Sequence, residues 1–328
     1  MSSGPLLELL GVTTTVLKDH RRVPVILDVS FAIRRGEIVG LVGESGSGKS
    51  MTARTVFRSL PPRATTEGEI LLNGQDVMKM SAVQLREARA RSIGVIFQDP
   101  RSGVDPLWTV EDHITEGMRV HRGLTRTEAR EEAIDLLGQV GIRDASRRLR
   151  QYPGELSGGL LQRVVIAGTL AAKPELIIAD EPTTALDVTT QSEIVALLSS
   201  LRRDRGLAML FITHDLTLAA SICDRIMVMY AGRIVEAQSH QGILTHPAHP
   251  YTRGLVAARP TIEARQERLE VISGVPTSAA DAPSGCAFHP RCRFAQERCR
   301  TLVPPLAEVD NGLSACLRNA EIHDELDV

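Results

Sequence analysis

The sequence of 328 residues predicts an α/β fold with a mostly parallel core sheet. One observation is a glycine-rich loop, residues 43–50, between a short apolar run and a helical pattern. The other is an alternation further along, where apolar runs at 176–180 and 208–213 follow helical patterns at 158–172 and 189–203. Strands joined by helices of this length pair in parallel through right-handed crossovers. The sequence has no internal repeat, so we expect one such unit.

Composition narrows the class of protein. The net charge of −2 gives no basic footprint, so we expect no nucleic-acid partner. The hydrophobic content of 43% suits a globular chain. No apolar run approaches the ~18–20 residues of a membrane span. The N-terminus lacks the basic segment and apolar core of a signal peptide, which predicts a cytosolic chain with reduced thiols.

Further elements flank the predicted core. Residues 6–45 are rich in short β runs, and another run at 68–72 ends in the turn signal Asn73-Gly74. Residues 226–236 predict a hairpin that turns at Ala231-Gly232. From about 105 to 150 the pattern is helical, and Thr125 and Glu128 have capping-box spacing. One apolar helix face comprises Ala129, Ala133, Leu136, Leu137 and Val140.

The loop at 43–50 matches G-x-x-x-x-G-K-[ST], the phosphate-loop pattern. Its backbone N–H groups would curl around the β-phosphate at a helix N-terminus. Lys49 would reach the β- and γ-phosphates, and the Ser50 hydroxyl would bind Mg²⁺. The alternative is an accidental match in a Gly/Ser-rich turn, but the flanking strand and helix favour triphosphate binding. The candidate nucleotide-binding residues here are Gly43, Glu44, Ser45, Gly46, Ser47, Gly48, Lys49, Ser50 and Met51.

Two more segments suit phosphate chemistry. The apolar run at 176–180 ends in Asp180 and Glu181, which could hold Mg²⁺ through water and polarise the attacking water, respectively. Without the phosphate loop, a solvated strand end would be the commoner interpretation. In the second segment, Ser157 caps a predicted helix, and Gly158 and Gly159 leave its first N–H groups uncovered. An ordinary capped helix is the alternative.

Together the phosphate loop, the Leu-Ser-Gly-Gly segment and the Asp-Glu pair resemble the ATP-binding-cassette (ABC) ATPases. Gln98 matches the family's Q-loop, Ala185-Leu186-Asp187 its D-loop, and His214 its switch histidine. The resemblance implies an ABC-type P-loop ATPase with an N-terminal antiparallel β subdomain and a helical insert at about 100–160. It implies catalytic roles for Glu181, His214 and Gln98, and an Mg²⁺ site at Ser50, Gln98 and Asp180.

The same resemblance implies that two cassettes sandwich two ATP molecules head to tail. Ser157, Gly158, Gly159 and Asp187 are further candidate nucleotide-binding residues, and Ser157 and Gly159 would contact the partner's γ-phosphate. The chain would therefore need a second ABC ATPase subunit, identical or related. A soluble ABC ATPase without a membrane partner is the rival hypothesis.

A closer resemblance, to the dipeptide/oligopeptide importer ATPases, covers nearly the whole chain. It is carried by the segments at 43–48, 97–100, 180–187, 229–236, 249–252 and 285–292. It implies a nucleotide-binding domain at 1–255 and a C-terminal extension at 256–328. It also implies import of peptides, or of nickel chelates or glutathione, through two membrane-spanning permease subunits. An extracytoplasmic solute-binding protein would deliver the solute, and the ATPase would lie on the cytoplasmic face of the membrane.

Three positions depart from the family pattern. Residues 12–16 contain no aromatic ring for the adenine, unless His20 or Arg21 substitutes. Leu160-Leu161 replaces a more polar pair, which we interpret as a packing variation. Trp108, the only tryptophan, lies where the permease is expected to bind, and either a core anchor or an interface residue is possible.

The extension carries four of the five cysteines, Cys286, Cys292, Cys299 and Cys316. No C-x-x-C spacing occurs, which argues against a zinc finger or ribbon. Four thiolates without histidine suit a [4Fe–4S] cluster, which the importer resemblance also implies. Zinc, free thiols and disulfides are the alternatives. The arginines at 291, 293, 298 and 300 could offset the negative charge of a thiolate-ligated cluster. Cys223 is expected to be a small buried residue.

Overall fold

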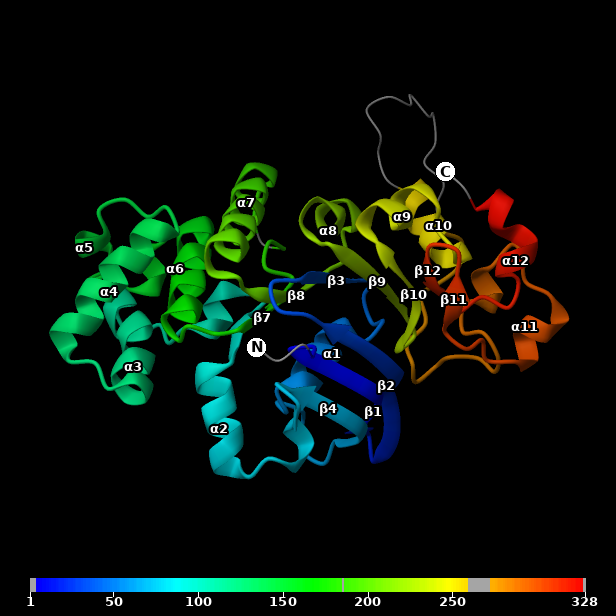
Figure 1. The fold of residues 1–328 in the computed structure, drawn as a ribbon, viewed down its shortest axis with the longest axis horizontal. Coiled ribbons are helices and arrows are strands. Elements are labelled where there is room, and N and C mark those ends of the chain that lie inside the picture. The colour runs from blue at the N-terminus through cyan, green and yellow to red at the C-terminus, as the bar shows by residue number, and fades with distance from the viewer. Residues whose placement is uncertain (1–3, 185, 259–271, 327–328) are drawn as a thin grey trace. The chain divides into compact units, whose positions relative to one another are not determined.

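The computed structural model describes residues 4–184, 186–258 and 272–326 (Figure 1). They form two compact units. Unit 1 comprises the described residues of Met1–Ile33, Ile38–Met78 and Phe211–Val328, and unit 2 comprises Arg34–Glu37 and Lys79–Leu210. The division falls within strand β8 (Ala208–Thr213). In the described parts of both units, no helix is long and apolar enough to cross a membrane.

Unit 1 begins with an antiparallel sheet in the order β2-β1-β4-β5, drawn in blue and cyan in Figure 1. Alternate residues of β1 are buried on either side of a register shift, Leu7 and Leu9 before it and Val12 and Thr14 after it, because one face of the sheet covers the core. The antiparallel subdomain implied by the family resemblance is therefore confirmed. The strands are β1 (Leu7–Lys18), β2 (Arg21–Ile33), β4 (Thr65–Leu72) and β5 (Gln75–Asp76).

A second sheet of unit 1 has the order β11-β12-β10-β9-β3-β8. Strand β3 (Ile38–Val42) pairs in parallel with β9 (Arg225–Tyr230), and all its residues are buried and apolar or glycine. Parallel strands covered on both faces show this composition. The predicted hairpin is confirmed: β9 turns into β10 (Arg233–Ser239) at Ala231 and Gly232, both with positive φ.

The C-terminal extension contributes strands that the sequence did not predict. Strand β12 (Gly312–Ser314) pairs with β10, and β11 (Ala307–Val309) pairs with β12. Three-residue strands are too short to show a recognisable alternation. The helices of unit 1 are α1 (Lys49–Val56), α8 (Leu216–Ile222), α9 (His240–Thr245), α10 (Pro250–Ala257), η4 (His289–Arg291), α11 (Glu297–Thr301), α12 (Asn319–Ile322) and η5 (His323–Glu325). The short helix η1 (Val77–Lys79) begins in unit 1 and ends with the first residue of the next segment of unit 2.

The predicted domain boundary at 255/256 lies within α10, and the described chain stops shortly afterwards at residue 258. The boundary therefore stays a prediction. Cys223 follows α8 and is 3% exposed, which confirms that it is buried.

Unit 2 contains the sheet order β8-β7-β6 and the helical insert. Strands β6 (Ile93–Ile96) and β7 (Leu176–Asp180) pair in parallel. The predicted apolar helix face is buried, and the Thr125–Glu128 capping box forms. Helices α3, α4 and α6 pack against one another (Figure 1). The helices are α2 (Ala82–Arg91), η2 (Pro100–Gly103), α3 (Val110–Arg122), α4 (Arg126–Gln139), α5 (Ala145–Arg148), η3 (Pro153–Glu155), α6 (Gly158–Ala171) and α7 (Val188–Arg205).

Candidate functional site

The phosphate loop connects β3 to α1 in unit 1, and two of its glycines are required by close backbone contacts. A Cβ atom at Gly43 would lie 2.2 Å from the carbonyl oxygen of Met229. A Cβ atom at Gly48 would lie 2.8 Å from that of Val25, and Gly48 has a φ of +111°. Only glycine combines this space with this conformation. The loop therefore passes between β2 and β9 with no room for a side chain at either point.

Hydrogen bonds fix the course of the loop. The Gly232 N–H in the β9–β10 turn donates to the Ser47 carbonyl at 2.8 Å. The Lys49 ammonium donates to the carbonyls of Gly43 and Glu44, at 2.7 and 3.0 Å. Lys49 is 5% exposed and Ser47 only 2%. The loop thus curls around its own lysine, and Ser50 and Met51 continue into the first turn of α1.

Two contacts to this loop were missed by sequence reasoning. The Glu44 N–H donates to the Tyr251 phenol oxygen at 2.9 Å, and the Glu44 carboxylate pairs with Arg291. Tyr251 belongs to the His-Pro-Tyr-Thr motif, which was only a mark of the family, and Arg291 was assigned to charge balance in the cysteine tail. No local pattern connects residues so distant in sequence.

The other tail arginines also have partners of their own. Arg298 pairs with Glu321, Arg300 lies 3.8 Å from Glu297, and Arg293 lies over the Phe294 ring. The expectation that these arginines offset the charge of a thiolate-ligated cluster stays a prediction, because these contacts do not test it. Their charges are already engaged by nearby carboxylates and rings.

In unit 2, the predicted catalytic pair lies together. The Gln98 amide donates to the Glu181 carboxylate at 3.3 Å, and the Thr184 hydroxyl donates to the same oxygen at 2.6 Å. Glu181 has a φ of +48°, a left-handed conformation that is uncommon for a residue with a side chain. Such strain is often found at functional sites. Asp180, the preceding residue, ends β7.

Two buried or half-buried glutamines hold the segment after Glu181 in place. The Gln162 amide on α6 donates to the Pro182 carbonyl at 2.8 Å. The Gln191 amide on α7 donates to the Thr183 carbonyl at 3.1 Å. Gln162 is 1% exposed, so its polar group needs this partner. Sequence reasoning treated this region of α6 as a packing variation and missed the positioning role of Gln162.

The Leu-Ser-Gly-Gly segment forms the exposed N-terminus of α6, and we call residues 157–159 the serine–glycine turn. Ser157 caps the helix by accepting from the Leu160 N–H at 3.4 Å. Both Ser157 and Gly158 are exposed to solvent. A Cβ atom at Gly159 would lie 2.8 Å from the Thr190 methyl carbon, so glycine lets α6 approach α7 closely.

Asp187 caps the neighbouring helix α7. Its carboxylate accepts from the Thr190 N–H at 3.0 Å and from the Thr190 hydroxyl at 2.7 Å. These hydrogen bonds, that of the backbone first, lower the pKa of Asp187 and keep it ionised. Ala185, the first residue of the predicted D-loop, lies outside the described residues.

The candidate residues are divided between the two units. The phosphate loop and His214, which is exposed after β8, belong to unit 1. Gln98, Asp180 and Glu181 belong to unit 2. The hydroxyl, amide and carboxylate oxygens of Ser50, Gln98 and Asp180 are of the type that Mg²⁺ prefers. How the two sets of residues meet stays a prediction.

The four extension cysteines line one cavity of about 20 Å³, together with Phe288, Phe294 and Ile322. Burial raises the pKa of Cys292 to about 11 and that of Cys316 to about 12, so these thiols are protonated at neutral pH. Within residues 4–184, 186–258 and 272–326, no three cysteine, histidine or carboxylate side chains form a metal-binding group. The four thiols match an iron–sulfur cluster in the kind and number of ligands, but their sulfur atoms are not arranged as a metal-binding group.

A hollow of about 730 Å³ lies along the outer side of α3 in the helical insert. Its lining combines apolar and charged side chains, namely Trp108, Asp112, Glu116, Arg119, Val120 and Leu124. Trp108 is 36% exposed and its ring lies 5.9 Å from that of His113. Trp108 is therefore not a core anchor, and of the two predicted alternatives only a surface role remains.

Comparisons with known proteins show the family to which the chain belongs. The ABC transporter family matches residues 26–184, and the C-terminal region of the oligopeptide/dipeptide transporter family matches residues 235–299. A Brucella melitensis protein named as a peptide import ATP-binding protein is 44% identical, over 98% of this chain and 99% of the relative. OppD of Escherichia coli, an oligopeptide transport ATP-binding protein, is 40% identical over 96% of this chain and 94% of its own.

Solved structures give the same result for the fold. A dimeric bacterial ABC transporter cassette matches with a TM-score of 0.64 and 29% identity, covering 71% of this chain and 98% of the cassette. A post-hydrolysis state of such a cassette, bound to ADP and phosphate, matches equally well. Since relatives above 30% identity are covered almost from end to end, the chain belongs to the ABC ATPases of the oligopeptide/dipeptide transporter family.

Proposed function

We propose that this chain binds and hydrolyses ATP to power the import of peptides across a membrane. The observation that carries the proposal is the joint match of one chain to the ABC transporter family and to the oligopeptide/dipeptide C-terminal region. Relatives at 39–44% identity are named as peptide import, oligopeptide transport or dipeptide transport ATP-binding proteins. Of the solutes considered, peptides are therefore favoured over nickel chelates and glutathione.

The phosphate loop would bind the triphosphate. Its backbone N–H groups and the α1 N-terminus would face the phosphates, and Lys49 would exchange its loop carbonyls for the β- and γ-phosphates. Ser50, Asp180 and Gln98 would hold Mg²⁺, which would neutralise charge on the phosphates. The support is the oxygen donor set together with the backbone contacts that fix the loop.

Hydrolysis would depend on Glu181. Its carboxylate would orient and polarise the attacking water, Gln98 would position it, and His214 would contact the γ-phosphate. The support is the Gln98–Glu181 contact of 3.3 Å and the constrained backbone at Glu181. The hydrogen bonds from Gln98 and Thr184 can keep the Glu181 carboxylate in place through the reaction.

The nucleotide would be enclosed by two cassettes. Ser157, Gly158 and Gly159 of one chain would contact the ATP on the partner's phosphate loop, and Asp187 would lie at the same interface. The exposed serine–glycine turn supports this, since its uncovered N–H groups suit an anionic group. The second cassette would be an identical or a related ATPase subunit.

The transporter would also contain two membrane-spanning permease subunits and an extracytoplasmic solute-binding protein. The chain would bind the permeases at the cytoplasmic face of the membrane, through the hollow along α3. Trp108 and Val120, 36% and 68% exposed, offer apolar contact area, and Arg119 and Glu116 offer polar partners at its rim. Membrane transport is thereby favoured over a free-standing ATPase.

We propose further that the four extension thiols hold a [4Fe–4S] cluster. The support is that all four line one cavity, whose lining includes His249, His289 and Arg318 besides apolar side chains. Anaerobic purification should give absorption near 400 nm, with about four iron and four sulfide per chain, the stoichiometry of the cluster. A colourless protein with one zinc per chain, or with four titratable thiols and no metal, would contradict the cluster.

The proposed function is tested by purification from membranes and reconstitution. Tagged protein should co-purify with two multi-span proteins, and proteoliposomes of the complex should import peptide only with ATP and a solute-binding protein. Trp108→Ala should lower co-purification, whereas Val83→Ala, at a more exposed apolar residue on α2, should not. Full ATPase activity with no membrane partner, in every extract tested, would contradict the transporter assignment.

A further inference from the structure

The C-terminal extension reaches the phosphate loop through one buried ion pair. Arg291 donates to both carboxylate oxygens of Glu44, at 2.6 Å from Nη1 and 3.0 Å from Nη2. The two residues are 247 positions apart in the sequence. The Arg291 side chain is 5% exposed and that of Glu44 is 24% exposed. A two-bond pair shielded from water is stronger and more directional than a surface pair.

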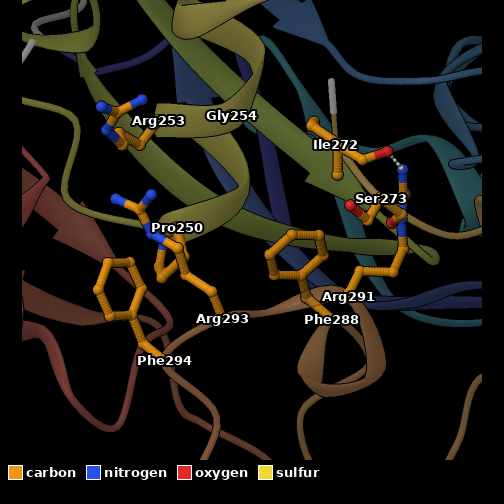
Figure 2. A pocket seen from close by; sticks show the side chains of 9 residues that line it. All are labelled: Pro250, Arg253, Gly254, Ile272, Ser273, Phe288, Arg291, Arg293 and Phe294. Carbon is orange, nitrogen blue, oxygen red and sulfur yellow. Dashed lines mark hydrogen bonds between the residues drawn. The ribbon is translucent and has the colours of Figure 1, made fainter. Parts of the chain in front are cut away.

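The guanidinium of Arg291 is itself held by the extension. Its Nε donates to the Ser273 carbonyl at 2.9 Å, and its Nη2 lies 3.5 Å from the Ile272 carbonyl oxygen (Figure 2). The rings of Tyr230 and Phe288 both lie 5.8 Å from it. Figure 2 shows the Phe288 ring in the same cavity, whose volume is about 140 Å³. Arg291 therefore has a fixed position from which it can orient a partner.

A second contact acts on the backbone of the same loop residue. The Glu44 N–H donates to the phenol oxygen of Tyr251 at 2.9 Å. Tyr251 is fully buried, and its ring centroid lies 4.7 Å from that of Tyr230. Burial, followed by the nearby Glu44 charge, raises the pKa of Tyr251, so the phenol stays neutral. Arg291 and Tyr251 thus hold the side chain and the backbone of Glu44.

Glu44 is also joined directly to the lysine of the loop. Its carbonyl, like that of Gly43, accepts from the Lys49 ammonium. A displacement of Glu44 would therefore move an atom that contacts Lys49. Glu44 is a variable position of the phosphate-loop motif, so this arrangement is a feature of the present chain and not a requirement of the motif.

We propose that Arg291 and Tyr251 are positioning residues for ATP binding. Through Glu44 they preset the phosphate loop, and the extension is thereby a structural part of the nucleotide site. The inference rests on the proposed ATP-binding function. Because both residues would act through Glu44, their loss should lower ATP affinity more than the hydrolysis rate of the bound state.

The test measures the Kd for a fluorescent trinitrophenyl-ATP and the KM and kcat of ATP hydrolysis, with the full chain in its assembled transporter for the kinetics. Arg291→Met and Glu44→Gln should each raise Kd and KM about 10-fold, with kcat changed less than about 2-fold. The double variant should be no weaker than either single variant, because both remove the same pair. Arg291→Lys should restore part of the affinity.

Tyr251→Phe keeps the buried ring and removes only the acceptor, so it decides the question if Arg291→Met does not fold. It should raise Kd about 5-fold, since one backbone hydrogen bond is lost. Arg298→Met is the matched control, because it removes an extension ion pair, with Glu321, away from the loop. It should leave Kd unchanged.

Three outcomes would overturn the proposal: wild-type Kd and KM in Arg291→Met and Tyr251→Phe, additive losses in the double variant, or an equal loss in Arg298→Met. Wild-type protein that binds no trinitrophenyl-ATP would refute the proposed function itself. The two failures are therefore distinguishable.

Discussion

The phosphate loop and the serine–glycine turn are both built to bind phosphate, yet their surroundings differ. The loop is enclosed by its own chain: Gly43 abuts β9, Gly48 abuts β2, and Glu44 is held by Tyr251 of α10 and by Arg291 of the extension. The turn points outward, with Ser157 and Gly158 exposed. Both lie at helix N-termini, so the difference is one of neighbours and not of local chemistry.

The comparison teaches that one chain can supply one phosphate-binding element that its own contacts hold in place and another that is exposed for a partner. Contacts from three regions distant in sequence preset the loop before a nucleotide arrives. The turn is held in place at Gly159, where α6 packs closely against α7. Ser157 and Gly158 are exposed, so another molecule can contact them. In the proposed two-chain site, the loop of one chain would bind the nucleotide and the exposed turn of the other would cover it.

The largest effect is expected at Glu181, the candidate catalytic carboxylate that follows both elements in the sequence. Glu181→Gln should lower ATP hydrolysis by about 100- to 1,000-fold, because an amide cannot accept a proton from the attacking water. ATP affinity should stay within about 2-fold, since the loop is unchanged. Phosphate release and nucleotide titration measure the two quantities. Glu193→Gln, at an exposed carboxylate paired with Arg163, is the control and should hydrolyse normally.

The next effect tests the enclosed half. Gly43→Ala should weaken ATP binding about 100-fold, because its Cβ atom would force the loop away from the Met229 carbonyl, 2.2 Å distant. Gly138→Ala, on α4 where an added Cβ atom meets nothing within 4 Å, is the matched glycine control. Isothermal titration with ATP compares them. Equal affinities for the two variants would show that the close backbone approach does not shape the site.

A smaller effect tests the outward half. Ser157→Ala should weaken ATP-dependent dimerisation about 10-fold and leave ATP binding by the single chain unchanged, because its hydroxyl would contact the partner's nucleotide and not its own chain's. Ser239→Ala removes an equivalent helix cap, on α9, and controls for the ~1 kcal/mol cost of losing a cap. Analytical ultracentrifugation separates dimerisation from binding. Equal dimerisation by both variants would mean that the turn faces no partner.

The smallest effect concerns the support behind the loop. Glu236 is buried and accepts from the N–H groups of Ala248 and His249, beside Tyr251. Burial raises its pKa from an ordinary 4.5 to about 7. The stability that the protonated carboxyl provides is therefore present below pH ~4.5 and lost as pH rises through about 7.

Urea unfolding of wild type and Glu236→Gln at several pH values isolates this term, because the amide does not titrate. The free energy of unfolding of wild type, measured relative to the variant, should fall by on the order of 1–3 kcal/mol between pH 5 and pH 8. His249, whose pKa burial lowers to about 3, is common to both proteins and cancels. A difference independent of pH would contradict the assigned pKa shift.

Much of the fold could be predicted because its signals are local. Strands β3 and β7 are short apolar runs, and α6 and α7 have helical length and cap residues at Ser157 and Asp187. The Thr125–Glu128 capping box is readable from two letters three residues apart. The candidate catalytic residues Gln98 and His214, by contrast, could be named only through the family resemblance.

The remaining features depend on contacts that no window of sequence contains. Strands β11 and β12 exist because β10 offers a free edge to three-residue segments. Arg291 resembled a charge beside cysteines, and only the fold brings it to Glu44. Gln162 has no distinguishing mark in the helical sequence, and only the fold shows its hydrogen bond to the Pro182 carbonyl. Such long-range pairs define the part of the site that sequence patterns leave open.

The most direct test of the two-chain site measures mass against nucleotide. Glu181→Gln protein, with its cognate second ATPase subunit supplied if the two differ, should be monomeric without ATP and dimeric at saturating ATP by multi-angle light scattering. Ser157→Ala in the same background should shift the transition to higher protein concentration. Protein that binds ATP and stays monomeric at every concentration would contradict the account.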